Sequence, residues 1–169
     1  MYFCVLKQNQ IKMKYSRLTK EQFEELHVEF SNFLASQQID KEEWDNLKAT
    51  KPEVAEQELD IFSDLVWEGV LQNAKFIEHF SKTHIFLFRF DETDIDTIVL
   101  KTLNPSVDFL NKEGLQWLSD HVFTEEVEIK YGAKKFESDR NSELFEIIKQ
   151  GGILSQGELY HQFKDLLNQ

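Results

Sequence analysis

A row of acidic residues in the first half of the chain is the clearest candidate for a binding site. The acids recur at every fourth position in a stretch with helical spacing of apolar residues; they are Glu56, Asp60, Asp64 and Glu68. This spacing brings like charges side by side on one helix face, which costs a few tenths of a kcal/mol per pair. We therefore expect the row to bind a basic partner surface. The alternative is that it is the solvated face of an amphipathic helix.

Two Glu-x-x-His spacings raise the question of a metal site. Glu24 with His27 and Glu158 with His161 each place a carboxylate and an imidazole on one helix face, as di-iron helix bundles do. Such bundles also need inward carboxylates from two further helices, whereas here a strand-rich section lies between the two pairs. We predict no metal site and no cofactor.

The sequence contains no motif of a known catalytic class. The G-x-S-x-G, H-E-x-x-H, P-loop and G-x-G-x-x-G patterns are all absent, and we assign no catalytic residue. A small enzyme with a histidine–carboxylate site remains an alternative, with His79, His84 and His121 as its candidates. That alternative requires a pocket that joins one of these histidines to an acid.

The charge of the chain is negative and unevenly distributed. Its 169 residues include 31 acids and 19 lysines or arginines, for a formal charge of −12. Residues 1–18 carry four bases and no acid, whereas residues 19–68 carry 14 acids and 4 bases. Because affinity for nucleic acids comes largely from lysine and arginine, this composition disfavours direct binding to DNA or RNA. It favours solubility and a basic protein partner.

The start of the chain is interpreted as an N-terminal extension. Residues 1–12 show no sustained period, and Met13 begins a stretch typical of a bacterial translation start; the alternative is a β-strand over residues 2–6. We expect residues 13–169 to form a single domain. One cysteine, Cys4, excludes an intramolecular disulfide and favours a cytoplasmic location. No apolar run approaches the roughly 18 residues of a membrane span, and no signal peptide is recognised.

The elements that position these residues are helices first, then strands, then helices. Apolar residues at helical spacing predict a helix over residues 20–37, a shorter one from Asp40 and a long central helix from Pro52. The apolar stripe of the long helix includes Ile77, so we expect this helix to reach Phe80.

Three strands are expected in the middle of the chain. The phenylalanine-rich residues 85–90 are apolar on both alternating faces, which predicts an interior strand followed by a hairpin turn and a second strand over 95–103. Alternation over residues 127–131 predicts a third strand with one wet face, at an exposed edge. We predict an α+β fold that is helix-rich, with a small antiparallel sheet of about three strands packed by the long central helix.

The remaining helices are predicted from capping residues. Asn104 followed by proline predicts the start of a helix that leads to Leu118. Two closing helices follow, one that ends at the Gly151-Gly152 pair and one that a capping box starts at Ser155.

Two segments carry a resemblance to a known family. They are MKYSRLTKEQF, which starts at Met13, and the phenylalanine-rich FLFRFDETD of residues 86–94. They are similar to an uncharacterised protein family of Bacteroidota, and the resemblance covers most of the chain from Met13 onward. It implies no activity, and no catalytic or binding residue is transferred from it.

These observations predict a cytoplasmic, acidic protein-interaction or regulatory factor that binds a basic partner surface. A small enzyme is the first alternative. The second is an acidic mimic of nucleic acid, which requires two lines of carboxylates spaced like duplex phosphates. We expect no membrane partner and no direct nucleic-acid partner. The sequence leaves open the oligomeric state and whether the edge at residues 127–131 pairs with another chain.

Overall fold

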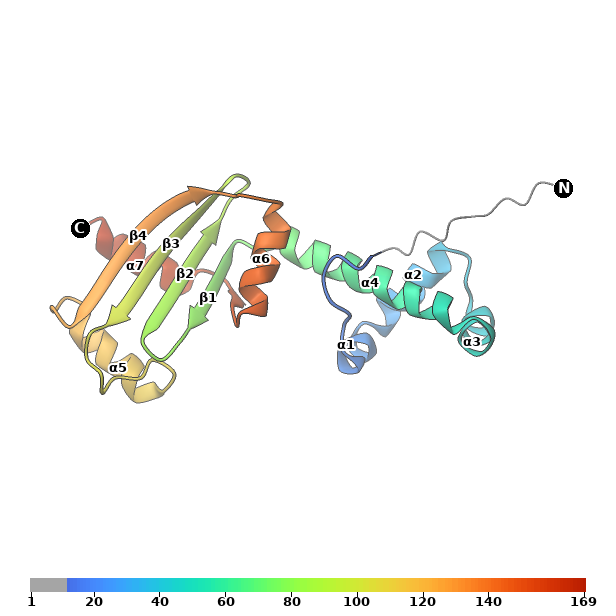
Figure 1. The fold of residues 1–169 in the computed structure, drawn as a ribbon, viewed down its shortest axis with the longest axis horizontal. Helices are drawn as coiled ribbons and strands as arrows, with labels where there is room; N and C mark the ends of the chain where they lie inside the picture. Colours follow the sequence, from blue (N-terminus) through green and yellow to red (C-terminus); the bar gives the residue numbers. More distant parts are fainter. Residues whose placement is uncertain (1–11) are drawn as a thin grey trace. The chain divides into compact units, whose positions relative to one another are not determined.

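The computed structural model describes residues 12–169, which form two compact units (Figure 1). The first unit ends at Val70, and the second is Leu71–Gln169. That residues 13–169 form a single domain stays a prediction. Of the predicted extension, all but Lys12 lies outside the described residues. No helix in the described part of the chain is long and apolar enough to cross a membrane.

The first unit is built of helices. Its elements are α1 (Lys20–Glu25), α2 (His27–Ser36), α3 (Lys41–Thr50) and the part of α4 (Pro52–Asn73) up to Val70. Thr19 forms a capping box with Gln22, in which each side chain accepts the backbone N–H of the other residue. The helix predicted over residues 20–37 is interrupted at Leu26, whose ψ of 23° departs from helical geometry.

Aromatic side chains form the centre of the first unit. The ring centroid of Phe62 on α4 lies 5.0 Å from that of Phe30 and 5.9 Å from that of Phe23. Phe30 also meets Trp44 of α3 edge-on at 5.4 Å. Each aromatic pair contributes about 0.5–1.5 kcal/mol beyond the burial of its area. This cluster holds the three shorter helices against α4.

The helix α4 ends at Asn73, although its apolar stripe continues. The next apolar residues form strand β1 (Phe76–Phe80), which pairs antiparallel with the phenylalanine-rich strand. Ile77 lies opposite Phe88 in this pairing and is fully buried. The prediction of a helix through these residues was wrong, because sheet pairing overrides helical spacing in a short apolar run.

The second unit contains a five-stranded antiparallel sheet in the order β4-β3-β2-β1-β5. Its other strands are β2 (His84–Phe90), β3 (Asp94–Thr102), β4 (Val127–Lys135) and β5 (Ile153–Ser155). The three predicted strands are β2, β3 and β4, and β4 lies at an edge as expected. The prediction of about three strands was too low, because β1 was assigned to a helix and β5 is too short to show a period.

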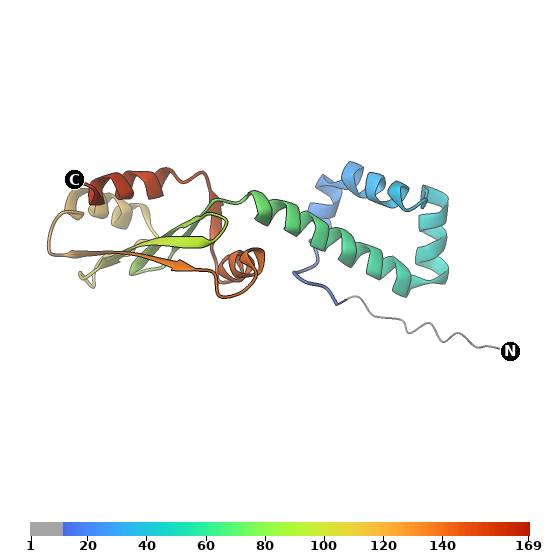
Figure 2. The same cartoon turned by 90° about the horizontal axis from the view of Figure 1, so that it is seen from above.

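Helices cover both faces of the sheet (Figure 2). α5 (Lys112–His121) and α7 (Glu158–Leu167) lie on one face, and α6 (Arg140–Lys149) lies on the other. A buried core joins the sheet to α5 and α7; it includes Ile85, Leu87, Ile98, Leu100, Leu118 and Tyr160. We predicted that the long helix packs this sheet, but α5 and α7 supply its core, while Phe62 of α4 packs with aromatic residues of the first unit.

α5 and α7 start later than predicted. Asn111 caps α5 by accepting the N–H of Gly114 at 2.8 Å, whereas the side chain of Asn104 closes a separate turn. Ser155 belongs to β5, and α7 begins after Gly157, whose φ of 83° lies in the left-handed region.

Arg140 at the start of α6 joins three parts of the second unit. Its guanidinium donates to the backbone carbonyls of Leu71 at 2.9 Å, Ala74 at 2.6 Å and Asp91 at 2.8 Å. The last carbonyls of a helix lack helical partners, and the first contact satisfies such a group in α4, while the second binds the residue directly after that helix. The third contact ties the same side chain to the β2–β3 turn.

We expect Gly114→Ala to destabilise the second unit by roughly 2–4 kcal/mol. A Cβ at this position would lie 1.8 Å from the carbonyl oxygen of Asp108, next to the buried Phe109. The measurement is denaturant unfolding followed by circular dichroism. Gly132→Ala is the matched control, because nothing lies within 4 Å of its Cβ position. Equal unfolding midpoints for the two variants would contradict the prediction.

Candidate functional site

The acidic row of α4 holds a basic segment of the chain itself. Each of the four acids contacts residues 14–18, which precede α1 and which we name the basic segment. Lys14 and Arg17 bring two positive charges to the four carboxylates. The contacts lie entirely within the first unit.

Asp64 binds the backbone of the basic segment. Its Oδ2 accepts the N–H of Lys14 at 2.7 Å, and its Oδ1 accepts the N–H of Tyr15 at 2.9 Å. Hydrogen bonds to a carboxylate are roughly twice as strong as those between neutral groups. Because both donors are backbone groups, Asp64 fixes the path of the segment without requiring particular side chains at these positions.

Arg17 binds the neighbouring pair of acids. Its Nε and Nη2 lie 2.7 and 2.6 Å from Oδ1 of Asp60, and its Nη1 donates to the carboxylate of Glu56. Nη2 also donates to the backbone carbonyl of Glu56 at 3.2 Å. The hydrogen bond to Glu56, and then that to Asp60, raises the pKa of the Arg17 guanidinium. One side chain therefore bridges two like charges that would otherwise repel each other.

Glu68 receives the other end of the basic segment. The Tyr15 hydroxyl donates to Oε2 of Glu68, and the Lys14 ammonium lies 3.3 Å from the same atom. Burial, and then the hydrogen bond to Glu68, raises the pKa of the Tyr15 phenol. Tyr15 therefore stays neutral and acts as a donor at neutral pH.

Two further contacts anchor the segment between the acids. The N–H of Leu18 donates to Oγ of Ser63 at 3.1 Å, and both residues are buried. Trp67 donates its indole N–H to the carbonyl of Ser16 at 3.1 Å. A buried serine on the acidic helix thus fixes the point at which the segment enters the core.

Sequence reasoning found the acidic row but missed its partner within the chain. The available signal was the charge of residues 1–18, which carry four bases and no acid. That signal does not show which base meets which acid, because the paired residues are about 40 to 50 positions apart. Binding of the row to a separate basic protein stays a prediction.

The histidines of the two Glu-x-x-His pairs have different contacts. His27 places its Nδ1 2.9 Å from the backbone carbonyl of Glu24, at the junction of α1 and α2. His161 is exposed, and its ring lies edge-on to Phe76 at 5.2 Å. Among residues 12–169, no three side chains of histidine, cysteine, aspartate or glutamate gather as a metal site requires.

The three histidines of the enzyme alternative lie in different surroundings. His79 and His84 both stack on Phe86, with ring centroids 5.8 and 5.7 Å from it. Glu78 precedes His79 on β1, so the two side chains point to opposite faces of the sheet.

His121 lies close to acidic side chains. Its Nε2 lies 3.9 Å from a carboxylate oxygen of Glu126, and its ring stacks on Trp117 at 4.4 Å. It also lines a surface pocket together with Glu113 and Asp120 of the same helix. All residues that line this pocket belong to α5, and Glu126 is not among them. The enzyme alternative stays a prediction.

A polar cluster lies under α7 in the second unit. Arg89 and Asp96 face each other on β2 and β3 with an Nη2–Oδ2 distance of 2.6 Å, and Asp96 is 8% exposed. The guanidinium carbon of Arg89 lies 6.0 Å from the ring centroid of Tyr160. Burial, and then the charge of Asp96, raises the pKa of Tyr160 to about 12. Such a phenol stays protonated at neutral pH and therefore does not serve there as a general base.

Comparison with known proteins identifies one family. A family model described as a family of unknown function, DUF6495, matches residues 13–168. The chain belongs to the DUF6495 family. This confirms the resemblance to an uncharacterised family, and the match includes the basic segment and the acidic row. No curated protein and no solved structure matches the DUF6495 chain significantly.

In the DUF6495 chain we expect Arg17→Glu to release the basic segment from α4. The change places a third carboxylate beside Asp60 and Glu56 and lowers the free energy of unfolding by roughly 1–2 kcal/mol. The measurement is tryptophan fluorescence with denaturant unfolding, because Trp67 binds the segment. Lys20→Glu is the matched control, since its side chain is 84% exposed. Identical spectra and midpoints for the two variants would contradict the prediction.

We expect Tyr160 to titrate later than an ordinary phenol in the folded DUF6495 protein. Its folded-state pKa is about 12 against an ordinary value of 10.0, so the folded state holds this proton more tightly than the unfolded state. Stability from this group is therefore present below pH 10 and is lost as the pH rises toward 12. Tyrosinate absorbance measures the titration. The late absorbance change should be smaller in Tyr160→Phe than in the parent, where Tyr15, whose pKa is also raised, contributes as well. It should be kept in Tyr131→Phe; an equal loss in Tyr131→Phe would refute the assignment.

Proposed function

We propose that this protein is an interaction or regulatory factor whose acidic row binds a basic segment of a partner protein. The observation that supports the proposal is the way the row binds residues 14–18 of its own chain. Asp64 accepts two backbone N–H groups, while Asp60 and Glu56 accept one guanidinium. This combination suits a non-helical peptide that contains arginine or lysine.

The charge of the row supports a second ligand. The row has four carboxylates, and the basic segment places two cations against them. The side chains of Glu56 and Glu68, at the two ends of the row, are 58% and 43% exposed. A basic partner is drawn to this surface by the field of an acidic protein, and the attraction weakens as salt rises.

The basic segment also sets the affinity of the row for other ligands. A partner peptide that uses Asp60 and Asp64 must displace Lys14, Tyr15 and Arg17 from them. Its apparent affinity is therefore reduced by the fraction of molecules in which the site is occupied by the chain itself. We propose that the factor acts in the cytoplasm, which the single cysteine of the sequence supports.

The test uses a labelled peptide with the sequence of residues 12–18, KMKYSRL, and the full-length protein. Fluorescence anisotropy measures its binding at low and high salt. We expect Asp60→Asn with Asp64→Asn to weaken binding about tenfold or more, because two charge-assisted contacts are lost. We expect Arg17→Ala to tighten binding, because the competing segment is held less firmly.

Two controls make the result specific. Glu21→Gln with Glu25→Gln removes the same charge outside the row and should leave the affinity unchanged. A peptide with glutamine in place of lysine and arginine should bind poorly to every protein. Equal binding of the KMKYSRL peptide by the parent protein and the Asp60→Asn, Asp64→Asn variant would overturn the proposed function.

A further inference from the structure

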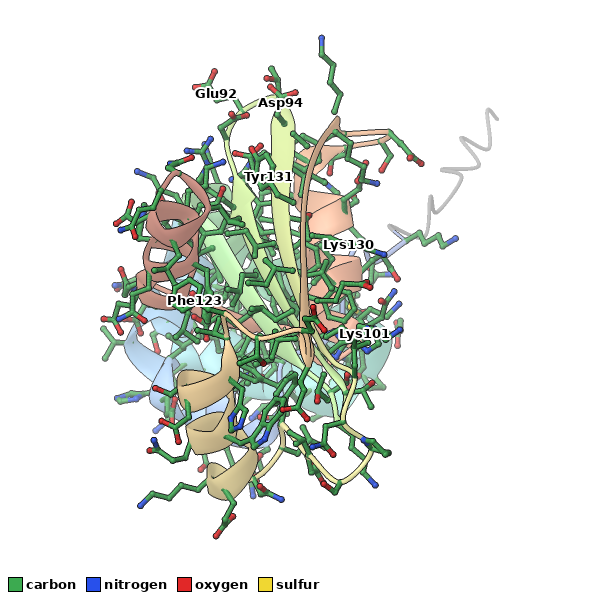
Figure 3. All side chains as sticks on the ribbon, turned by 90° about the vertical axis from the view of Figure 1, so that its left-hand side faces the viewer. Glu92, Asp94, Lys101, Phe123, Lys130 and Tyr131 are labelled. Atoms are coloured by element: carbon green, nitrogen blue, oxygen red, sulfur yellow. The ribbon has the colours of Figure 1, made fainter. Side chains whose placement is uncertain are left out.

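The outer strand β4 is an open edge in the second unit. It is nine residues long, pairs with β3 on one side and is the first strand in the sheet order. Figure 3 looks onto this edge, with Lys130 and Tyr131 on the strand nearest the viewer. Long edge strands are templates for pairing with another chain unless they are blocked.

Every second residue of β4 directs its backbone N–H and C=O groups to the side away from β3. Two hydrogen bonds flank the pairing with β3: Leu103 N–H to the Glu126 carbonyl at 2.8 Å, and Phe136 N–H to the Thr93 carbonyl at 3.2 Å. Both β4-side residues have even numbers, so alternation directs the N–H and C=O groups of even-numbered residues toward β3. The same groups of the odd-numbered residues in Val127–Lys135 point away from the sheet.

We propose that β4 pairs antiparallel with β4 of a second copy of this chain, about a twofold axis at Tyr131. In this register Tyr131 faces its own equivalent, and Ile129 faces Ala133 of the second copy. All are odd-numbered, so their outward N–H and C=O groups meet as hydrogen-bonded pairs. The whole of Val127–Lys135 is then paired, and the two sheets form one continuous ten-stranded sheet.

The charges on β4 are self-complementary in this register. On the face of the sheet opposite Tyr131, Glu128 lies across from Lys134 of the second copy, and the contact occurs twice because of the twofold axis. Lys130 lies across from Gly132, so no lysine opposes a lysine. Opposite charges across a strand pair stabilise it, and like charges destabilise it. A register centred on Ile129 instead would pair only residues 127–131.

Exposed apolar side chains near β4 also favour its pairing with a second copy of the chain. Phe123, in the loop before β4, is 76% exposed, and Tyr131 is 46% exposed (Figure 3). The Lys164 ammonium of α7 lies 3.5 Å from the ring centroid of Tyr131, and Leu167 in the last turn of that helix is 41% exposed. The twofold axis brings the two Tyr131 side chains together, whereas Phe123 of each copy lies near the far end of β4 of the second copy.

The experiment is a charge swap on the full-length protein, followed by sedimentation and by mixing of differently tagged variants. We expect the parent chain to be a dimer. E128K places lysine opposite lysine, and K134E places glutamate opposite glutamate, so each variant alone should dimerise roughly tenfold less tightly or worse. Mixing the two variants restores opposite charges at both contacts and should yield a heterodimer with the affinity of the parent.

The controls separate this interface from unfolding and from net charge. Circular dichroism and the unfolding midpoint check that both variants fold. Lys134 pairs with Glu137, whereas Glu128 pairs with Lys130 and also lies opposite Lys101 on β3, so some loss of stability is expected in E128K. E92K makes the same charge change in the β2–β3 turn and should remain dimeric. A monomeric parent at every concentration, or single variants that dimerise as the parent does, would overturn the proposal. The outcome is independent of the peptide binding proposed for α4.

Discussion

Four carboxylates along one helix face repel one another, and the first unit depends on how this repulsion is relieved. The chain relieves it with its own residues 14–18, which run along α4 and place backbone donors, a phenol and two cations against the acids. Asp64 accepts the backbone N–H groups of Lys14 and Tyr15, and these two hydrogen bonds do not depend on which side chains the two residues carry. The buried contact between Leu18 and Ser63 then leads the chain into α1.

Elements with one unambiguous period could be predicted from the sequence. Strands β2 and β3 and the edge position of β4 were found, because alternation over several residues has no helical interpretation. The capping box at Thr19 was found because both of its partners are local. Strand β1 was missed because Ile77 and Phe80 fit a helical stripe as well as a strand, and only pairing with β2 decides between them.

The candidate site could be predicted only in part, because the spacing of residues along one helix is local whereas the contacts between distant segments are not. Four acids on one helix face follow from spacing alone, whereas the residues that bind them lie far away in the sequence. The charge counts show that a basic stretch precedes an acidic stretch. They do not show which basic residue contacts which acidic residue. The Glu24–His27 spacing, by contrast, raised the question of a metal site formed by the two side chains. In the structure the His27 ring instead contacts the backbone carbonyl of Glu24.

The order of strands in the sheet has a consequence for how the second unit folds. Strands β1 to β4 are neighbours in both chain and space, so they form by successive local pairings, which close quickly. β5 and α7 follow this meander in the chain, and α7 brings Tyr160 and Phe163 to the core. During synthesis α5 therefore covers part of the apolar face of the sheet first, and the rest stays uncovered until α7 has been made. The nascent chain is most exposed to aggregation and to chaperones in that interval.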